Sequence, residues 1–464
     1  MEPDKELEQP VEPELTEDQI EAEQVAELEA AIETGRPGEI LDVLEQHHPA
    51  DAADLLEVLP RTMIGNATDM LADRFPTEIL LELRDEYREL VVDRLPDEFL
   101  AETLNNLDSD DAAVLLDDLE EERQADILKG LDRSEREELE RVLAFDEETA
   151  GRLMQRDFLA APEFWTVGQT VDHARDHADD LPESFFEIYV IDPAFRVLGA
   201  VSLHTILRNQ RSVPLGEIMH PIEIEISPDM DQEEVAYAFQ KYDLTSAPVV
   251  DESGRLTGMV TIDDVVDVIQ EENREDLLAL SGVSSSEALD TVLSTFRSRA
   301  PWLAVNVFTA FIASMVISIF DATIERIVAL AVLMPVVVAL GGNAGSQTLA
   351  VSVRALAERE LSGTTTRRTI VREALNALIN GIVFSLAVAV IAYFWFQDIR
   401  LSVVIALAML ATFMWAGLSG IIIPLTLKRL GADPAVASSV FLLTTVDIIG
   451  FLSFLGLATV FLIP

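Results

Sequence analysis

The feature that most constrains this chain is a sharp division in charge and hydropathy near residue 299. Residues 299–464 contain only eight acidic and ten basic side chains among long apolar stretches, so residues 1–298 carry a net charge of −53 in a chain whose total is −51. A helix of about 20 apolar residues crosses a bilayer. We therefore expect an acidic soluble part followed by a membrane domain.

The membrane domain is predicted to contain five spanning helices. Arginines gather in the loop 354–372, and Lys428 and Arg429 mark a second basic loop. The positive-inside rule places both loops in the cytoplasm. With a cytoplasmic N-terminus, five spans put the C-terminus outside the cell membrane. The predicted spans are 299–320, 323–355, 372–396, 400–427 and 434–463.

Asp447 is a lone carboxylate in the middle of the last predicted span. An ionisable group at that depth is costly and usually marks an ion or substrate pathway. The alternative is a carboxylate that only holds neighbouring helices together through hydrogen bonds. The sequence favours an ion pathway at Asp447.

The second predicted span contains Pro335 and the segment GGNAGSQ, residues 341–347. Proline and glycine are expected to bend or break this helix and to expose backbone carbonyls beside Asn343. The alternative is that the small residues only allow close helix packing. The clustering of amide and hydroxyl side chains favours a pore lining.

The composition of the soluble part excludes several classes of protein. Its negative charge repels nucleic acid phosphates and attracts divalent cations, although a charged surface suited to a salty cytoplasm is an alternative explanation. The chain has no cysteine, and therefore no disulfide or thiolate site. It also lacks a nucleophile with an adjacent histidine and a phosphate-binding glycine loop, so no enzyme activity is predicted.

The soluble part divides into segments of different pattern. An acidic, proline-bearing tail is expected to be disordered, and leucines at helical spacing then predict a stack of short helices. Two similar units follow, FFEIYVIDPAFRVLGAVSLHTIL and SAPVVDESGRLTGMVTIDDVVDVI, each with two strands and a helix. The predicted boundaries are 1–20 for the tail, 21–148 for the helical domain, 149–268 for the repeated α/β units and 269–298 for an acidic connecting helix.

The two α/β units resemble a tandem pair of CBS modules, for which ATP is a candidate ligand. The helix that closes the second unit continues as DDVVDVIQEENREDLLALSG and carries acids three and four residues apart on one face. Such a face binds Mg²⁺ through carboxylates and retained waters when an acidic surface opposes it. The alternative is a solvated charged face.

The order of these parts resembles the MgtE family of magnesium channels. The resemblance is carried by FDEETAGRLM (145–154), PVVVALGGNAGSQTLAVSVRAL (335–356), LGADPAV (430–436) and TTVDIIGFL (444–452). It implies an all-α N-terminal domain, an α/β tandem CBS pair and a five-helix transmembrane bundle. It also implies a homodimer in the lipid bilayer with one central pore.

The resemblance assigns roles to individual residues. Asp447 of each subunit would hold a hydrated Mg²⁺ ion, Asn343 would line the same passage, and Asp433 would lie toward the cytoplasmic mouth. Cytosolic Mg²⁺ would close the pore by bridging acidic side chains of the soluble domains. Val114 replaces an acid of the family pattern, so part of this sensor is expected to be weaker. The predicted sensor residues are Glu78, Asp110, Asp243, Asp264 and Asp267 in one cluster, and Glu233, Glu272, Glu275 and Asp276 in a second.

Two other functions are compatible with the same residues. One is a coupled cation exchanger in which Asp447 binds its substrate from each side in turn. The other is a membrane-tethered sensor that signals through its CBS pair, although this leaves the polar GGNAGSQ segment without a role. Oxygen ligands alone do not discriminate among Mg²⁺, Mn²⁺, Co²⁺ and Ni²⁺.

Overall fold

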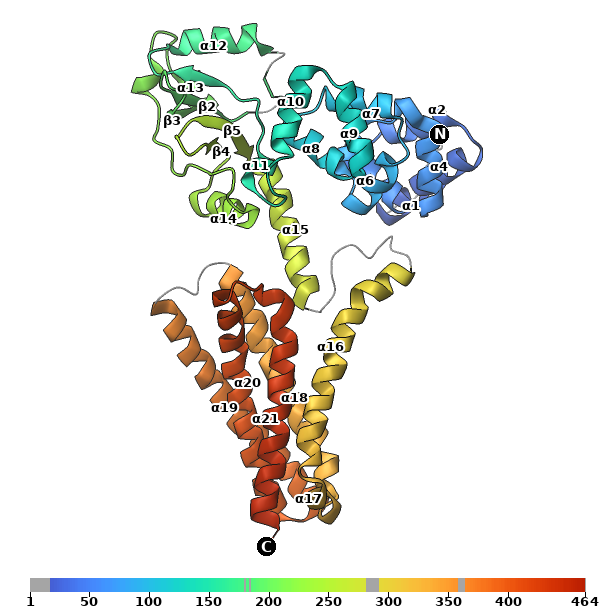
Figure 1. The fold of residues 1–464 in the computed structure, drawn as a ribbon, viewed down its shortest axis with the longest axis vertical. Coiled ribbons are helices and arrows are strands. Elements are labelled where there is room, and N and C mark those ends of the chain that lie inside the picture. The colour runs from blue at the N-terminus through green and yellow to red at the C-terminus, as the bar shows by residue number, and fades with distance from the viewer. Residues whose placement is uncertain (1–16, 179–180, 183–184, 281–291, 358–363, 464) are drawn as a thin grey trace, which may run out of the picture. The chain divides into compact units, whose positions relative to one another are not determined.

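The computed structural model describes the chain except for residues 1–16, 179–180, 183–184, 281–291, 358–363 and 464. It forms two compact units, residues 1–269 and 270–464 (Figure 1). The described elements are α1 (Glu17–Glu33), α2 (Pro37–Glu45), α3 (Pro49–Glu57), α4 (Arg61–Leu71), η1 (Ala72–Arg74), α5 (Thr77–Glu82), α6 (Asp85–Val92), α7 (Asp97–Leu104), α8 (Ser109–Asp117), α9 (Glu121–Gly130), α10 (Arg133–Val142), α11 (Ala150–Leu153), β1 (Ala160–Pro162), α12 (Val167–Asp176), β2 (Glu187–Ile191), β3 (Val197–Ser202), α13 (Leu203–Arg208), η3 (Leu215–Glu217), α14 (Gln232–Tyr242), β4 (Ser246–Val250), β5 (Leu256–Thr261), α15 (Ile262–Leu280), α16 (Val292–Ser318), α17 (Asp321–Arg326), α18 (Ala329–Ala357), α19 (Thr364–Phe396), α20 (Ile399–Arg429) and α21 (Pro434–Leu462).

Helices α2 to α10 are short, with 6 to 11 residues each, because turns interrupt the chain. Pro37 and Pro49 occupy the first helical position of α2 and α3, where proline costs no hydrogen bond. Leucines at helical spacing, such as Leu44, Leu56 and Leu80, are fully buried between the helices. Most of the predicted tail lies outside the described residues, but α1 begins at Glu17, within the segment assigned to that tail.

The two predicted α/β units are built alike. Strand β2 pairs antiparallel with β3, and β4 pairs antiparallel with β5, with the register shifting at the equivalent points Val190/Ile191 and Val249/Val250. The tight turns are also equivalent. The Asp192 carboxylate accepts the backbone N–H of Arg196, and the Asp251 carboxylate accepts that of Arg255, both at 2.9 Å. This repeated geometry follows from the repeated pattern of strand, acidic turn, strand and helix.

Helix α15 follows β5 directly and continues to Leu280, as the sequence predicts for the helix that closes the second unit. The rest of the predicted connecting segment, residues 281–291, lies outside the described residues, and α16 begins at Val292. The acids of this segment that the structure describes therefore belong to α15.

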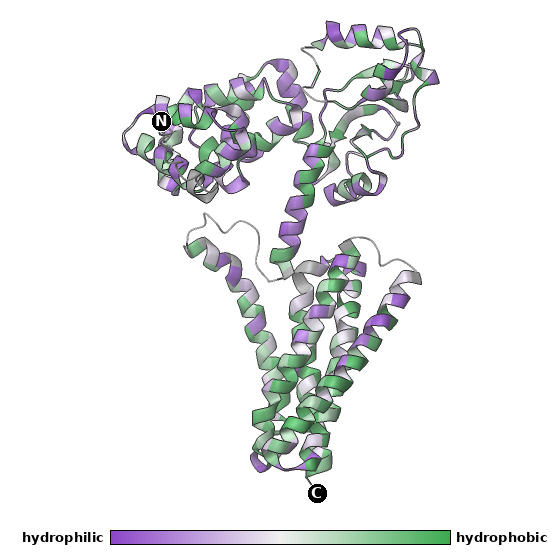
Figure 2. Cartoon of the chain, turned by 180° about the vertical axis from the view of Figure 1, so that it is seen from behind, coloured by the Kyte–Doolittle hydropathy of each residue, from purple (hydrophilic) through white to green (hydrophobic). Residues whose placement is uncertain are grey.

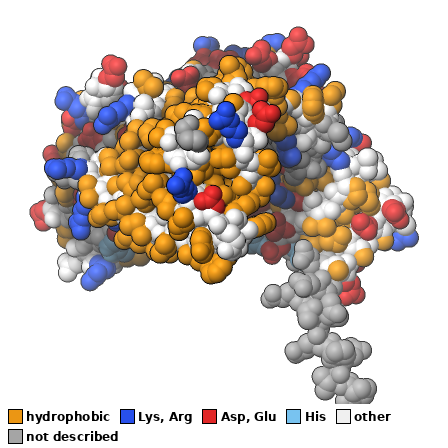
Figure 3. Space-filling view, turned by 90° about the horizontal axis from the view of Figure 1, so that it is seen from below, with side chains coloured by type: hydrophobic (Ala, Val, Ile, Leu, Met, Phe, Trp, Pro, Cys, Tyr) orange, Lys and Arg blue, Asp and Glu red, His pale blue; other side chains and the backbone are white. Residues whose placement is uncertain are grey.

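Five helices of the second unit are long and apolar enough to cross a membrane, as predicted. Hydrophobic residues run along them, whereas hydrophilic residues are interspersed throughout residues 17–269 (Figure 2). Phe308, Phe311 and Trp395 are each more than half exposed. Hydrophobic side chains also gather over the end of this unit seen in Figure 3. Such an apolar surface suits a lipid environment. The spans are Thr295–Ser318, Ala329–Leu356, Thr365–Phe396, Ile399–Arg429 and Ser438–Leu462.

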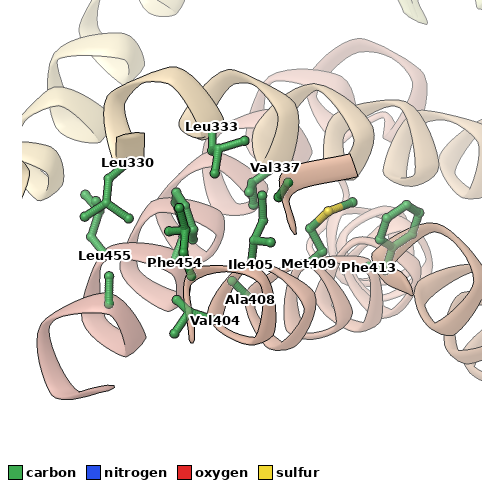
Figure 4. Close-up of a cluster of buried hydrophobic side chains, with 13 residues drawn as sticks. Leu330, Leu333, Val337, Val404, Ile405, Ala408, Met409, Phe413, Phe454 and Leu455 are labelled. Carbon is green, nitrogen blue, oxygen red and sulfur yellow. The ribbon is translucent and has the colours of Figure 1, made fainter. Parts of the chain in front are cut away.

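The core of the spanning unit lies where α18, α20 and α21 meet (Figure 4). Leu330, Val337, Ile405, Met409 and Phe454 are almost completely buried there. Their contacts fix the relative positions of α18 and α21, which carry the polar residues singled out from the sequence.

Of the bend or break predicted at Pro335 and the glycine segment, the break is wrong. Helix α18 runs without interruption from Ala329 to Ala357. Gly341 and Gly345 are buried, and their bare backbone lies against Thr412 and Leu442 of neighbouring helices. Close packing therefore explains these glycines, because an intact helix satisfies its backbone within a membrane and small residues let helices approach.

Candidate functional site

Contacts at glycines show which residues of α18 lie opposite which residues of α21 in the spanning unit. A Cβ added at Gly345 would lie 3.2 Å from Leu442, and one added at Gly341 would lie 3.1 Å from Val446. At the other end of this contact, Gly450 faces Val338. The two helices therefore run antiparallel, and a residue near position 340 of α18 lies level with Asp447 of α21.

Asp447 lies in the middle of α21, 13 residues from its first residue and 15 from its last. Its side chain is partly exposed on the single chain. In the part of the chain that the structure describes, the Asp447 carboxylate forms no hydrogen bond or ion pair. The alternative role, a hydrogen bond to a neighbouring helix, therefore receives no support from the described residues.

Asn343 is 14 residues from either end of α18 and is exposed. It lies about one helical turn from the level of Asp447, given a rise of about 1.5 Å per residue. Ser346 and Gln347 are also exposed, three and four residues further along, and so share the face of Asn343. A continuous helix therefore presents these polar groups at mid-span. Asp433, by contrast, is exposed beside the first residue of α21.

Acidic side chains of α8, of its N-cap residue and of α15 meet at a partly buried contact in the first unit. We call the six residues the acidic interface: Asp108, Asp110, Asp111, Asp263, Asp264 and Asp267. Asp110 is 6% exposed, and its Oδ1 atom has no hydrogen-bond partner within the described structure. Burial raises the pKa of Asp110 well above its ordinary value, and the charge of Asp264 raises it further. Burial and the charges of Asp108 and Asp263 raise the pKa of Asp111 to about 6.

Asp264 is the central acid on the α15 side. Burial raises its pKa to about 7, although Thr261 Oγ1 donates a hydrogen bond of 2.6 Å to Asp264 Oδ2. The pKa of Asp267 is also raised, first by burial and then by the charge of Asp263. Carboxylates that repel one another in a partly dry contact favour proton or cation binding.

The acidic interface does not form a ready-made chelate. Among the described residues, no three acidic or histidine side chains are arranged to hold one metal ion directly. Mg²⁺ keeps several of its waters and often uses only one or two carboxylates. The geometry therefore suits a hydrated ion held between the two helices better than an ion stripped of its waters.

Ion pairs hold the α8 side of this contact in place. Arg88 Nε lies 2.6 Å from Asp118 Oδ2, with both side chains nearly buried, and Arg152 Nη2 lies 2.6 Å from Asp117 Oδ1. The backbone N–H of Arg156 donates to Ser109 Oγ at 3.1 Å. The last two contacts tie α8 to the segment that leads into the first α/β unit.

The remaining predicted sensor residues are spread over other elements. Glu78 is exposed on α5, and Asp243 ends α14 in the left-handed conformation with φ of 53°. Neither is among the charges that shift the pKa values of Asp110, Asp111, Asp264 or Asp267. Glu233 is exposed in the first turn of α14. The acids near the end of α15 range from exposed to partly buried, and they are Glu272, Glu275 and Asp276.

Three acids and one base that lie at the acidic interface are not among the site residues predicted from the sequence. Asp108, Asp111 and Asp263 are chain neighbours of predicted residues, so the runs DSDD and DD already contained this signal. Arg88 was not predicted, because its charge acts on Asp111 from a helix far away in the sequence.

Three family models match the chain: "Divalent cation transporter" over residues 334–457, "MgtE intracellular N domain" over 47–148, and "CBS domain" over 215–271. The curated relatives that match the chain include the magnesium transporters MgtE of Bacillus subtilis and of Thermus thermophilus. The Bacillus subtilis protein is 30% identical to this chain, and the match covers 92% of this chain and 95% of that protein. The Thermus thermophilus protein is 34% identical, and the match covers 70% of this chain and 73% of that protein.

A solved structure, the cytosolic domain of the Mg²⁺ channel MgtE in complex with ATP, is 34% identical with a TM-score of 0.48, and it covers 53% of this chain and 99% of that one. The relatives match both the soluble and the spanning parts of the chain. The chain therefore belongs to the MgtE family.

Proposed function

We propose that this protein carries Mg²⁺ across the cell membrane through a pathway that passes Asp447. The observation that carries the proposal is an Asp447 carboxylate at mid-span that has no hydrogen-bond or ion-pair partner among the described residues and lies within about one turn of the exposed Asn343. The relatives named magnesium transporters support the choice of ion.

A second copy of the chain completes the proposed pathway. A carboxylate exposed at mid-depth is expensive in lipid, so it is expected to face a protein partner or a watery cavity. Two Asp447 carboxylates that face one another supply two negative charges for one divalent ion. Because Mg²⁺ sheds water reluctantly, the pair would hold the ion through its waters, with Asn343 as a further hydrogen-bonding group.

The acidic interface supplies a means of control. When cytosolic Mg²⁺ is abundant, an ion between α8 and α15 offsets the repulsion of their carboxylates and favours the closed channel. When Mg²⁺ is scarce, repulsion separates the two helices. Mg²⁺ thus shifts the population by binding one state more tightly than the other. ATP binding by the CBS pair and an extracellular C-terminus stay predictions.

The test is Mg²⁺ uptake by proteoliposomes that contain the full chain, with a membrane potential negative inside and no opposing ion gradient. Asp447→Asn keeps the shape of the side chain and removes its charge. We expect uptake to fall to the level of empty vesicles. Asp321→Asn, which removes one acid at the start of α17, is the matched control and should conduct like the parent.

Each of the other possible results would favour a different function or a different pathway for this protein. Normal uptake by Asp447→Asn would remove Asp447 from the pathway. Uptake that requires an opposing cation gradient would favour the coupled exchanger. No uptake by the parent under any gradient would favour the membrane-tethered sensor.

A further inference from the structure

At one end of the spanning unit, α18 and α19 border a pocket of about 610 Å³. Three arginines and two threonines line it together with Val351 and Ala355, and no acidic side chain is among these lining residues. The arginines are Arg354, Arg368 and Arg372, and the threonines are Thr365 and Thr369. The charged side chains among the described lining residues are all basic, in contrast with a chain whose net charge is −51.

The pocket presents a set of donors that suits a phosphate group. In the described part of the chain, Arg368 forms no ion pair or hydrogen bond. The Arg372 Nε donates to Glu373 Oε1 at 3.2 Å, so this guanidinium is already oriented. Guanidinium groups bind phosphate in a two-pronged manner, and the first turn of the long helix α19 adds backbone N–H groups and a favourable dipole.

An exposed apolar stripe follows the basic pocket along α19. Val371, Leu375 and Ile379 are each about half exposed or more, and they recur at the four-residue spacing of one helix face. The apolar spans themselves end at Leu356 on α18 and begin at Thr365 on α19, so the pocket lies at the predicted membrane boundary. A ligand that fits both features has an anionic phosphate head and a hydrocarbon tail.

We propose that this pocket binds the headgroup of an anionic glycerophospholipid whose acyl chain lies on the apolar stripe of α19. Basic pockets between spanning helices recognise such headgroups at the cytoplasmic side. The bound lipid would link α18 to α19 at one end of α18. Asn343 lies on the same helix, 11 residues from Arg354 or about 16 Å. The binding itself does not depend on which ion the protein carries.

The experiment uses the full chain in nanodiscs of equal parts phosphatidylcholine and phosphatidylglycerol. The protein is released into mild detergent, and native mass spectrometry measures the ratio of the two lipids that stay bound. We compare the parent with Arg368→Gln. Arg367→Gln is the matched control, because it removes the same charge one residue away from a side chain that does not line the pocket.

We expect phosphatidylglycerol to be enriched about tenfold on the parent and on Arg367→Gln, the factor expected from charge-assisted hydrogen bonds. On Arg368→Gln the ratio should fall toward that of the nanodisc. Arg368→Lys keeps the charge but loses the planar fork, and should lie between these values. Because Arg368 is exposed, these variants should fold like the parent. The elution volume in size-exclusion chromatography and the helical content from circular dichroism check this expectation.

Two results would overturn the proposal. Equal loss of phosphatidylglycerol from Arg367→Gln and Arg368→Gln would show diffuse attraction, and full retention by Arg368→Gln would show that the pocket does not bind the lipid. A further arm adds inorganic phosphate to protein in phosphatidylcholine nanodiscs. If it raises the melting temperature through Arg368 as much as phosphatidylglycerol does, the site takes a soluble anion and the lipid assignment is wrong.

Discussion

The carboxyl group of Asp110 on α8 is buried, and the charge of Asp264 on α15 acts on it, although 153 residues separate the two in the chain. Asp110 Oδ1 has no hydrogen-bond partner in the described structure. A native contact that keeps two such acids together retains unfavourable electrostatic energy unless a proton or a cation binds. This contact is therefore the part of the soluble unit that should respond most strongly to pH and to divalent ions.

The acidic interface should make the soluble unit more stable as pH falls. The pKa of Asp264 is about 7 in the folded chain and near 3.8 when unfolded, so the folded state binds more protons between these values. Stability is therefore greatest near pH 4 as far as this group is concerned, and it decreases as pH rises through 7. Thermal unfolding between pH 5 and 8 in EDTA measures the effect.

Asp264→Asn provides the control for that pH dependence. It should stabilise the soluble unit at pH 8, on the order of 2 kcal/mol, and flatten the dependence on pH. A variant whose unfolding temperature changes with pH as steeply as that of the parent would contradict the assignment to Asp264.

Neutralising the α15 side of the acidic interface should weaken control by cytosolic Mg²⁺. In Asp264→Asn with Asp267→Asn, the repulsion that separates the helices and the charge that binds Mg²⁺ are both reduced, so the open fraction should depend less on Mg²⁺ than it does in the parent. Patch recording from inside-out membranes measures the open fraction over a range of Mg²⁺ concentrations, and we expect its change across that range to shrink about tenfold or more.

Asp51→Asn with Asp54→Asn is the matched control for this pair. It removes two exposed acids at the same three-residue spacing on α3, far in the sequence from α8 and α15. The control should close at the same Mg²⁺ concentration as the parent. A double variant at 264 and 267 with unchanged sensitivity would remove the acidic interface from gating.

Arg88 should matter more for folding than the exposed arginines around it. Arg88→Ala leaves Asp118 nearly buried without its partner, which should cost about 3 kcal/mol. Arg133→Ala breaks an exposed pair with Glu137 and should cost less than about 1 kcal/mol. Urea unfolding of the two variants measures the difference, and equal midpoints would show that the Arg88 pair contributes no more than a surface pair.

The sequence predicted the five spans, the repeated α/β units and the order of the parts, because hydropathy and turn residues act locally along the chain. It placed Asp447 and Asn343 at mid-span for the same reason. It did not predict that α18 stays intact through Pro335, because the contacts of Gly341 and Gly345 come from other helices. Nor could local patterns identify Arg88, whose partner Asp118 lies 30 residues away.

Adjacent glycines in α18 should respond very differently to one added methyl group. At Gly341 the new Cβ would lie 2.4 Å from Thr412 Cγ2 of α20, a separation that forces the helices apart. At Gly342 the nearest atom would be Leu443 Cδ2 at 3.4 Å, an ordinary contact. Gly341→Ala should therefore lower stability by about 1–3 kcal/mol, whereas Gly342→Ala should be neutral or slightly stabilising, since alanine favours helix.

The measurement is thermal unfolding of both full-length variants in the same detergent, followed by Mg²⁺ uptake in vesicles. Because α18 carries Asn343, spreading α18 away from α20 should also reduce uptake by Gly341→Ala. Gly342→Ala should keep the uptake of the parent. If both variants unfold at the temperature of the parent, α18 tolerates extra volume at Gly341, and close packing against α20 does not explain the glycine at this position.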